Sequence, residues 1–407
     1  MKIKSCRNCK SRKLKSVFKL GKFSFTGKFP KKKQKIKKAN IELVICKSCK
    51  LVQLADNYDL NYLYGKDYGY RTGINKTMTE HMRKIAYRLS KRVGLKNNDA
   101  VLDIASNDGT LLNFYKKNVI TFGVDPILSK YKKNYKNINF KLSDFFDYNK
   151  VCKKFNNKFK IITALSVFYD LKNPNKFLKD LSNLITNDGL ILIELADLQS
   201  IIKKKMFDTF CHEHLEYYST TVINRMLSKN NLELIDIKEN DINGASKQFY
   251  IAKKNSVYKS NLKKIKYFLK LEKKEKLNTE HTFYMLKKEI SSLKKELLNK
   301  INILLKDKKK IHGYGASTKG NVLLQFFGID NKKIELISDR NPKKSNLYTP
   351  GTNIKIVNEK ISRSKKPDYY LVLPWHFKNE ILRREKTLLK KKTKFIFPLP
   401  KITVSTI

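Results

Sequence analysis

Residues 101–112 read VLDIASNDGTLL, and this stretch decides the fold of the central part of the chain. An apolar run reaches a turn with one glycine, and a second apolar run continues as a helix, which is the strand–turn–helix unit of α/β folds. The apolar runs at residues 119–126, 138–146, 159–171 and 187–198 predict further strands, with helical spacing between them. We therefore expect a doubly wound α/β domain, because strands that alternate with helices form a parallel sheet.

The turn after the first strand indicates which kind of ligand this sheet binds. Ligands of open α/β sheets bind outside the carboxyl ends of the strands. The turn lacks the GxGxxG phosphate cradle and carries two acids, Asp103 and Asp108, which repel a pyrophosphate. Gly109 lets the backbone come close at the start of the helix. S-adenosylmethionine fits such a turn, since its sulfonium and ammonium groups can pair with acids; a purely structural turn is the alternative.

Acids also follow the second and third strands. Asp125 in GVDP is placed to hold both ribose hydroxyls of a nucleoside. In SDFF, Asp144 suits the amino group of an adenine ring and Phe145 suits its face. The complete predicted cofactor-binding set is Asp103, Ala105, Ser106, Asp108, Gly109, Asp125, Asp144 and Phe145.

Four cysteines near the N-terminus form two CxxC pairs, CRNC and CKSC, and residues 40–45 form a predicted strand that leads into the second pair. Each pair can point two thiolates at one ion, and two pairs complete a tetrahedral zinc site. The predicted ligands are Cys6, Cys9, Cys46 and Cys49. Four thiolates leave no open position for water, so the zinc would be structural, and a core this small needs such a staple. Four free cysteines without a metal are the alternative.

Residues 208–219, DTFCHEHLEYYS, concentrate groups that bind metals or move protons. A zinc hydrolase of the HExxH class needs histidines four positions apart, and here they are two apart, so that class is excluded. A metal site from Cys211, His212 and His214 remains one alternative. Acid–base chemistry is the other, because a histidine titrates near neutral pH. Methyl transfer to carbon would need such a base beside a ketone, and a group that holds the enolate oxygen.

The rest of the chain predicts a second α/β unit. Residues 220–255 read as a helix and two strands, and residues 256–309 are lysine-rich with helical periodicity, typical of a solvated connector. The stretch GYGASTKG then begins a strand–turn–helix unit whose amides and Lys319 could meet an anion. A glycine turn that only packs helix on strand is the alternative. We expect domains at residues 1–60, 61–255 and 310–407, with 256–309 as the connector.

The composition limits the possible partners. The 407 residues carry a formal net charge of +52, but the lysines are spread through every region and arginine is scarce, so we expect no nucleic-acid partner. An attraction to anionic substrates is more consistent with this spread. The N-terminal residues have no apolar core of a secretory signal, and no apolar run reaches the 18 residues of a membrane helix. We expect a cytoplasmic enzyme without a membrane partner.

Taken in order, the motifs resemble those of the sugar C-methyltransferases of deoxysugar biosynthesis, which act at C-3 of nucleotide-linked 4-keto sugars. The matching stretches span nearly the whole chain: CxxC…CxxC, TMTEH, VLDIASNDGTLL, DTFCHEHLEYYS, NGASKQFY, GYGASTKGN, SDRNPKKSNLYTPGT and LPWHFKNEI. The resemblance implies a zinc module, a class I S-adenosylmethionine-dependent methyltransferase domain and a C-terminal Rossmann-like domain. It also implies a nucleotide sugar bound between the last two.

The same resemblance implies roles for individual residues. His214 would be the general base that removes the proton beside the ketone, and Glu213 would assist it. Tyr70 and His81 would lie near the sugar and the enolate, and the substrate-binding residues would be Tyr68, Lys319, Asn321 and Trp375. The enolate carbon would then attack the sulfonium methyl in line, so positioning matters most. Transfer to oxygen or nitrogen of another small acceptor is the alternative, and a zinc-containing nucleic-acid-binding protein is a further one.

Two positions depart from the family pattern. The usual glycine after DI is Ala105, which would tighten the methionine pocket. The position before HEH is a tyrosine in the well-described members and is Cys211 in this chain. Either Tyr217 or Tyr218 substitutes for that phenol, or the acceptor differs.

Overall fold

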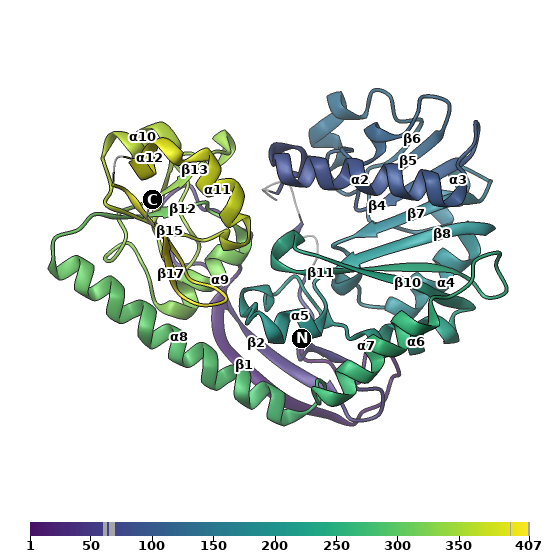
Figure 1. Cartoon of the computed structure of the whole chain (residues 1–407), viewed down its shortest axis with the longest axis horizontal. Helices are drawn as coiled ribbons and strands as arrows, with labels where there is room; N and C mark the ends of the chain where they lie inside the picture. The colour runs from purple at the N-terminus through teal and green to yellow at the C-terminus, as the bar shows by residue number, and fades with distance from the viewer. Residues whose placement is uncertain (60–62, 65–69, 391, 406–407) are drawn as a thin grey trace.

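The computed structural model describes residues 1–59, 63–64, 70–390 and 392–405. Three sheets organise this part of the chain: an N-terminal sheet of four strands, a central sheet of seven and a C-terminal sheet of six. Figure 1 shows the central and C-terminal sheets side by side, with a long helix running beneath the C-terminal domain and a long N-terminal hairpin beside that helix. No helix among the described residues is long and apolar enough to cross a membrane.

The central sheet is the predicted doubly wound α/β sheet, with strand order β10-β11-β8-β7-β4-β5-β6. Its parallel strands are β4 (Ala100–Ile104), β5 (Ile120–Val124), β6 (Phe140–Leu142), β7 (Phe159–Leu165) and β8 (Ile185–Leu195). Two antiparallel strands extend it, β10 (Leu232–Asn240) and β11 (Ser246–Lys253). β4 is buried along its whole length because both faces of the sheet are covered.

Helices cover the two faces of the central sheet with separate cores. Val101 and Ile161 pack with α2 (Lys76–Val93), whereas the next residues, Leu102 and Ile162, pack on the opposite face. That opposite face is covered by α3 (Tyr148–Lys154), α4 (Pro174–Leu184), α6 (Thr220–Lys229) and α7 (Leu262–Lys274). The alternation of neighbours between the two cores is the period of two expected for strands.

The predicted helix after the first strand was wrong. The structure has a single turn of 3-10 helix there, η2 (Leu112–Phe114), and Tyr115 is already extended. The segment of residues 105–119 connects β4 to β5, which pairs directly with β4, and its residues Ala105, Asn107 and Gly109 have positive φ angles that a regular α-helix does not allow. The cofactor-side loop is therefore held by tertiary contacts.

The N-terminal sheet contains a strand that the sequence pattern did not predict. β1 (Leu14–Ser24) pairs antiparallel with β2 (Lys38–Cys46), and β3 (Val52–Leu54) follows. The fourth strand, β9 (Glu216–Tyr217), comes from the DTFCHEHLEYYS motif and pairs with β3. The sheet that carries the cysteines is thus completed by a strand distant in sequence.

The C-terminal sheet has the order β14-β13-β12-β15-β16-β17 and is parallel except for its last strand. Its strands are β12 (Ile311–Tyr314), β13 (Leu336–Asp339), β14 (Lys355–Asn358), β15 (Tyr369–Val372), β16 (Lys394–Phe397) and β17 (Thr403–Ser405). Its helices are α9 (Thr318–Phe327), α10 (Glu359–Ser364), α11 (Lys378–Arg384) and α12 (Lys386–Lys390). This topology agrees with the predicted Rossmann-like unit.

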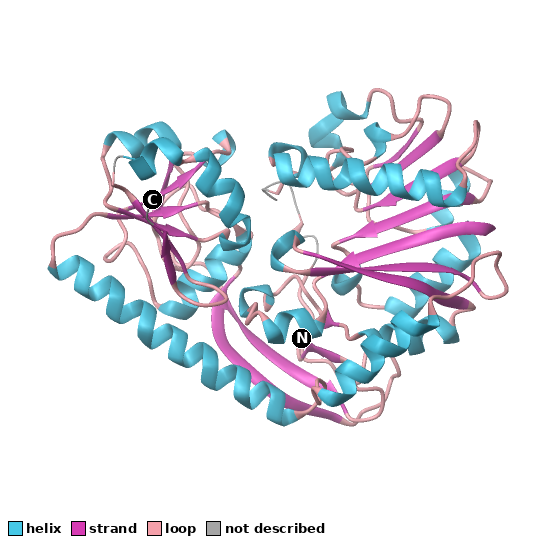
Figure 2. Cartoon of the chain, in the orientation of Figure 1, coloured by secondary structure: helices cyan, strands magenta, loops and turns pink. Residues whose placement is uncertain are grey.

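The lysine-rich connector is helical, as predicted, but it is not fully solvated. α8 (Glu280–Lys306) buries one stripe of side chains at helical spacing: Phe283, Leu286, Ile290, Leu293, Leu297 and Ile301. This stripe belongs to one core with residues of β1 and α9, and Figure 2 shows the helix lying along both the hairpin and the C-terminal domain. α8, the hairpin and the C-terminal domain therefore share one hydrophobic core.

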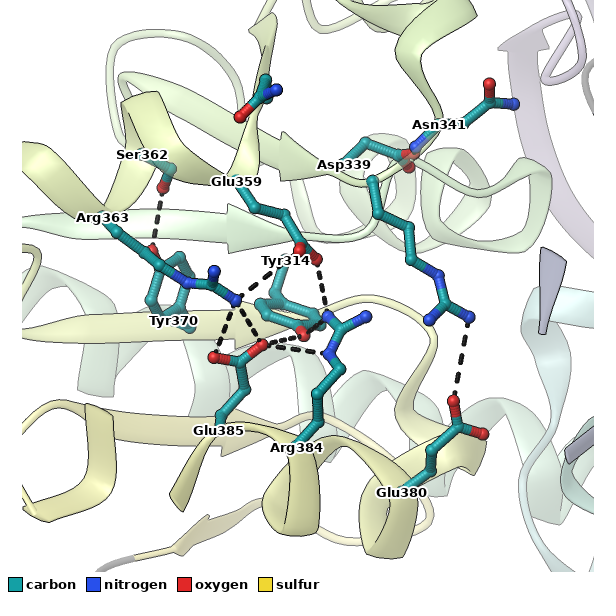
Figure 3. Close-up of polar contacts among 12 residues, drawn as sticks. Tyr314, Asp339, Asn341, Glu359, Ser362, Arg363, Tyr370, Glu380, Arg384 and Glu385 are labelled. Carbon is teal, nitrogen blue, oxygen red and sulfur yellow. Dashed lines mark hydrogen bonds and ion pairs between the residues drawn. The ribbon is translucent and has the colours of Figure 1, made fainter. Parts of the chain in front are cut away.

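Polar side chains at the C-terminal sheet and on its helices α10 and α11 form a cluster whose members pair with one another (Figure 3). Glu385, which is 2% exposed, accepts hydrogen bonds from Arg363 at 2.8 and 3.0 Å and from the Tyr314 hydroxyl at 2.8 Å. Arg384 contacts both Glu385 and Glu359. Since these charges pair with one another, the cluster stabilises the packing of α10 and α11 on the sheet.

Candidate active site

The four predicted metal ligands lie together at one end of the N-terminal sheet. The Sγ atoms of Cys6 and Cys49 are 3.5 Å apart, as are those of Cys9 and Cys46, and all four lie within 4.8 Å of one another. Tetrahedral zinc with bonds of about 2.3 Å places its sulfur ligands about 3.8 Å apart. The cluster therefore fits zinc, and four thiolates close its coordination shell.

The two CxxC turns share one backbone conformation. Lys10 donates its amide hydrogen to the Cys6 carbonyl at 3.0 Å, and Lys50 does the same to Cys46 at 2.9 Å. Both lysines have positive φ angles, 60° and 65°. Each turn thus curls back around its two sulfur atoms, as a metal knuckle requires.

A cavity of about 340 Å³ lies where the carboxyl ends of the central strands meet the C-terminal domain. Its cofactor side comes from the loops after β4, β5 and β6 and includes Asp103, Ala105, Ser106, Asn107, Asp125 and Phe145. Its other side includes Glu194, Cys211, Glu213 and His214 from the central domain, with Lys319 and His376 from the C-terminal domain. One cavity therefore joins both predicted binding regions.

The loop after β4 is rigidly held. Ala105 has a φ of 60°, so this alanine adopts the left-handed conformation that glycine takes most easily. The Asn107 amide donates to Asp125 at 2.8 Å, and the Ile127 amide donates to the other Asp125 oxygen at 2.8 Å. Burial raises the pKa of Asp125 to about 6 and that of Asp103 to about 7. These buried acids fit a ligand that brings positive charge.

Three of the predicted cofactor-binding residues do not line the cavity. The Asp108 carboxylate turns toward Arg71 and the Gly73 amide, both at 3.0 Å, and holds the segment that precedes α2. Gly109, with a φ of 75°, packs where a side chain would meet Tyr135. Asp144 is half-exposed and pairs with Lys150, which lowers its pKa. These residues support or flank the cavity instead of facing it.

Replacing Asp103 with asparagine is expected to stabilise the ligand-free protein at pH 8 and to weaken cofactor binding. Because burial raises this pKa from 3.8 to about 7, the contribution of Asp103 to stability is full below pH 3.8 and is lost as the pH rises through 7. Removing the buried charge should therefore raise the unfolding free energy by a few kcal/mol at pH 8. Thermal unfolding at pH 5 and pH 8 checks this.

Asp144→Asn is the matched control, since its carboxylate is exposed and lies outside the cavity lining. It should leave both cofactor affinity and the pH dependence of unfolding nearly unchanged. A gain for Asp103→Asn that is equal at the two pH values would contradict the assigned burial of the charge.

His214 lies at the meeting point of the two sides of the cavity. Its Nδ1 is 2.8 Å from the Thr209 carbonyl oxygen, at the end of η5 (Phe207–Thr209), so Nδ1 must carry the hydrogen. The lone pair of the neutral ring is then on Nε2. The Tyr169 ring packs against the imidazole with centroids 4.2 Å apart. Burial and the positive charge of Lys319 lower the pKa of His214 to about 3.

Glu213 and Cys211 line the cavity beside His214. Glu213 is 3% exposed, and burial raises its pKa. Hydrogen bonds from Cys211 and Thr26 act in the opposite direction and lower this pKa. Neither Tyr217 nor Tyr218 lines the cavity: both are fully buried, and Tyr218 stacks on Phe168. The suggestion that one of these tyrosines replaces the missing phenol is therefore wrong, because the strand pairing of β9 draws the chain away from the cavity.

His81 does not line the cavity itself but lies behind a residue that does. Its Nε2 is 2.9 Å from both carboxylate oxygens of Glu194, which also accepts from Gln248 at 2.6 Å and Asn240 at 3.0 Å. Sequence reasoning missed Glu194, although a single acid inside the apolar run of residues 190–196 was a usable signal. Tyr70 lines the cavity, and Tyr68 lies outside the described residues.

A second missed acid, Asp170, also lines the cavity. It is 7% exposed, and one of its oxygens accepts a hydrogen bond from the Tyr64 hydroxyl at 2.7 Å. Burial raises its pKa well above the ordinary value. It lies near the end of the apolar run of residues 159–171, as Asp125 lies near the end of the run of residues 119–126, so the reasoning applied to Asp125 would have found it.

The C-terminal domain contributes one predicted residue directly. Lys319, in the first turn of α9, lines the cavity, donates to the Asn243 carbonyl at 3.2 Å and has its pKa lowered by burial. The predicted Trp375 and Asn321 do not line it. Trp375 donates to Asp208 at 2.9 Å, and Asn321 donates to the Thr26 carbonyl at 2.7 Å. Both are buried residues that hold neighbouring segments in place.

Known protein families match the three parts of the chain. Residues 6–64 match the family described as "Putative zinc binding domain", residues 74–237 match "Methyltransferase domain", and residues 241–400 match "C-methyltransferase C-terminal domain". The chain is 25% identical over 363 residues to C-methyltransferase NovU of Streptomyces niveus. The alignment covers 88% of this chain and 86% of that relative.

Solved structures resemble the chain over less than half of its length. A S-adenosylmethionine-dependent methyltransferase from Clostridium acetobutylicum is 15% identical and covers 43% of this chain and 91% of its own, with a TM-score of 0.35. Magnesium protoporphyrin IX methyltransferase from Synechocystis, solved with bound SAH, is 13% identical and covers 44% of this chain and 88% of its own, with a TM-score of 0.34.

Proposed function

Because the chain is an S-adenosylmethionine-dependent methyltransferase of the C-methyltransferase family, we propose that it methylates C-3 of a nucleotide-linked 4-keto deoxysugar. The observation that carries the proposal is the placement of His214. Its ring lines the cavity between the cofactor side and Lys319, with the lone pair fixed on Nε2. A base in that position can remove a proton from an acceptor held between the two domains.

The cofactor side suits the methyl donor. When bound, S-adenosylmethionine supplies an electrophilic methyl group, and Asp125 and Asp103 would hold its ribose and its positively charged end. Phe145 offers an aromatic face for the adenine. The task of these residues is to fix the donor in line with the acceptor carbon, because alignment of two reactants supplies much of the rate enhancement.

The acceptor side suits an anionic substrate with a ketone. Lys319 and the N-terminus of α9 would hold the diphosphate, since helix N-termini and cations both attract phosphate. Burial and the positive charge of Lys319 both lower the pKa of His214, and a diphosphate at Lys319 would offset the second of these causes, so substrate binding would strengthen the base. Proton removal is then favoured only when the acceptor is in place.

The remaining polar groups would control the enolate. Glu213 is buried beside the base, where burial raises its pKa, and it would assist the removal of the proton. Tyr70 faces the same cavity and would contact the sugar. His81 would act through Glu194, which it contacts, and not by touching the sugar. Donors placed at the developing oxyanion are what transfer to carbon needs.

The test is methyl transfer from S-adenosylmethionine labelled with ¹³C in the methyl group, against a panel of nucleotide-linked 4-keto sugars. The expected product carries the label on carbon, seen by NMR as a methyl group coupled to the sugar carbon skeleton. A labelled methyl on oxygen or nitrogen would favour the alternative of O- or N-methyl transfer, and no product with any sugar of the panel would reject the proposed acceptor class.

A further inference from the structure

The N-terminal zinc module contacts nearly every residue of the catalytic loop, defined here as residues 211–217. β3 pairs with β9, so that Gln53 lies opposite Glu216 and Val52 opposite Tyr217. The Leu54 amide donates to the Leu215 carbonyl at 2.8 Å. The loop that carries His214 therefore ends in the edge strand of the sheet that carries the cysteines.

Arg7 connects the metal site to this loop. It lies between Cys6 and Cys9 in the first CxxC turn and is 4% exposed. Its Nη1 donates to the Leu54 carbonyl at 2.8 Å and to the Leu215 carbonyl at 3.4 Å, and its Nε is 3.6 Å from Glu216. Because zinc would hold both cysteines that flank Arg7, the metal would also fix the direction of this guanidinium.

Gln53 contacts both Arg7 and the metal ligand Cys6. Its side-chain oxygen accepts from the Arg7 amide at 3.0 Å, and its nitrogen donates to the Cys6 sulfur at 3.2 Å. A continuous set of contacts thus runs from a metal ligand through Gln53 and Arg7 to the backbone of Leu215, which directly follows His214.

Residues at the end of the hairpin that is distant from the cysteines also contact the catalytic loop. The Thr26 hydroxyl is 3.4 Å from both oxygens of Glu213, and the Thr26 carbonyl accepts from Asn321 of α9 at 2.7 Å. His212 contacts the Ala39 carbonyl at 3.2 Å, and its ring packs on Phe25 at 4.6 Å. The hairpin therefore links the catalytic loop to the helix that carries Lys319.

We propose that the zinc module positions the catalytic loop, with Arg7 and Thr26 as its two positioning residues. A zinc site that only stabilised its own small core would not need the loop as a strand or an arginine inside a CxxC turn aimed at it. Loss of zinc should then loosen the loop while the cofactor turn, residues 103–109, keeps its structure, because that turn is held by Asp125 and Tyr135 of the central domain.

Amide hydrogen exchange followed by mass spectrometry tests this without any acceptor sugar. After zinc is removed with a chelator, peptides that contain residues 211–217 should exchange at least about tenfold faster, and peptides that contain residues 103–109 should be unchanged. S-adenosylmethionine affinity should stay within about twofold. Equal loosening of both regions, or no loosening of the catalytic loop, would overturn the proposal.

Thr26→Val supplies a second measurement that does not disturb the metal. It removes the hydroxyl near Glu213 and keeps the backbone carbonyl that Asn321 contacts. If the proposed methyl transfer is correct, kcat should fall about five- to tenfold with unchanged cofactor affinity and zinc content, and Thr26→Ser should restore it. The control is Ser16→Ala, which removes an exposed hairpin hydroxyl that contacts Glu42.

The outcomes distinguish the positioning role of the zinc module from the proposed function. Thr26 would be rejected as a positioning residue if the Thr26→Val variant turned over as fast as the wild type. It would also be rejected if Thr26→Ser did not restore the turnover that Thr26→Val had lost. Absence of wild-type turnover on every keto sugar would instead reject the proposed function, and the hydrogen-exchange result would still decide whether zinc positions the loop.

Discussion

Replacing His214 with alanine is expected to abolish methyl transfer while leaving S-adenosylmethionine binding intact. The hydrogen bond of Nδ1 to the Thr209 carbonyl fixes the lone pair on Nε2, and the ring lies between the donor and acceptor sides of the cavity. Loss of a general base typically costs about 10²–10⁴-fold in rate. Calorimetric titration with the cofactor and single-turnover kinetics on the same preparation separate the two effects.

The matched control is His281→Ala, because His281 is exposed at the start of α8 and away from the cavity. Its turnover should equal that of the wild type. Turnover of His214→Ala within a few-fold of the wild type would show that His214 is not the base. The assignment of proton removal would then pass to another cavity residue.

The second large effect is expected for Cys46→Ser, which removes one of the four predicted zinc ligands. Structural zinc sites contribute about 10–16 kcal/mol of binding free energy that is available only to the folded state. This exceeds or rivals the whole stability of an ordinary domain, so the first module should lose its zinc and unfold. Zinc content by atomic emission and thermal unfolding give the two measurements, and turnover should be lost with them.

Cys152→Ser is the control for this prediction. Cys152 is a half-buried free cysteine of α3, outside the four-cysteine cluster. Its replacement should leave zinc content, melting and turnover nearly unchanged. If the Cys46→Ser variant has the melting temperature and the turnover of the wild type, the assignment of a structural role to the metal is wrong.

Most of the fold could be predicted because the strands of both α/β sheets are continuous apolar runs. β1 could not, since its eleven residues contain three lysines and a glycine and show no regular alternation, and it is stabilised by contacts with α8 that only the tertiary structure supplies. The pairing of β9 with β3 was hidden for a similar reason: a two-residue strand has no periodicity to detect.

The site could be predicted in part. The rule that acids follow parallel strands located Asp103 and Asp125, the glycine turn GYGASTKG located Lys319, and a resemblance located His214 and Glu213. The rule says where a residue lies along the chain but not where its side chain points, and so Asp108 and Asp144 were expected in the cavity although both turn to neighbouring basic groups. Asn321 and Trp375 belong to matched motifs, yet their side chains are used for packing.

The central claim is that the enzyme makes a carbon nucleophile by removing a proton beside a ketone. It is tested most directly by incubating the enzyme in heavy water with a nucleotide-linked 4-keto sugar and S-adenosylhomocysteine, so that no methyl group can be transferred. The predicted result is deuterium at C-3, seen by proton NMR with the wild type and absent with His214→Ala. An unexchanged C-3 proton, in an enzyme that transfers methyl to oxygen or nitrogen of the same sugar, would contradict the claim.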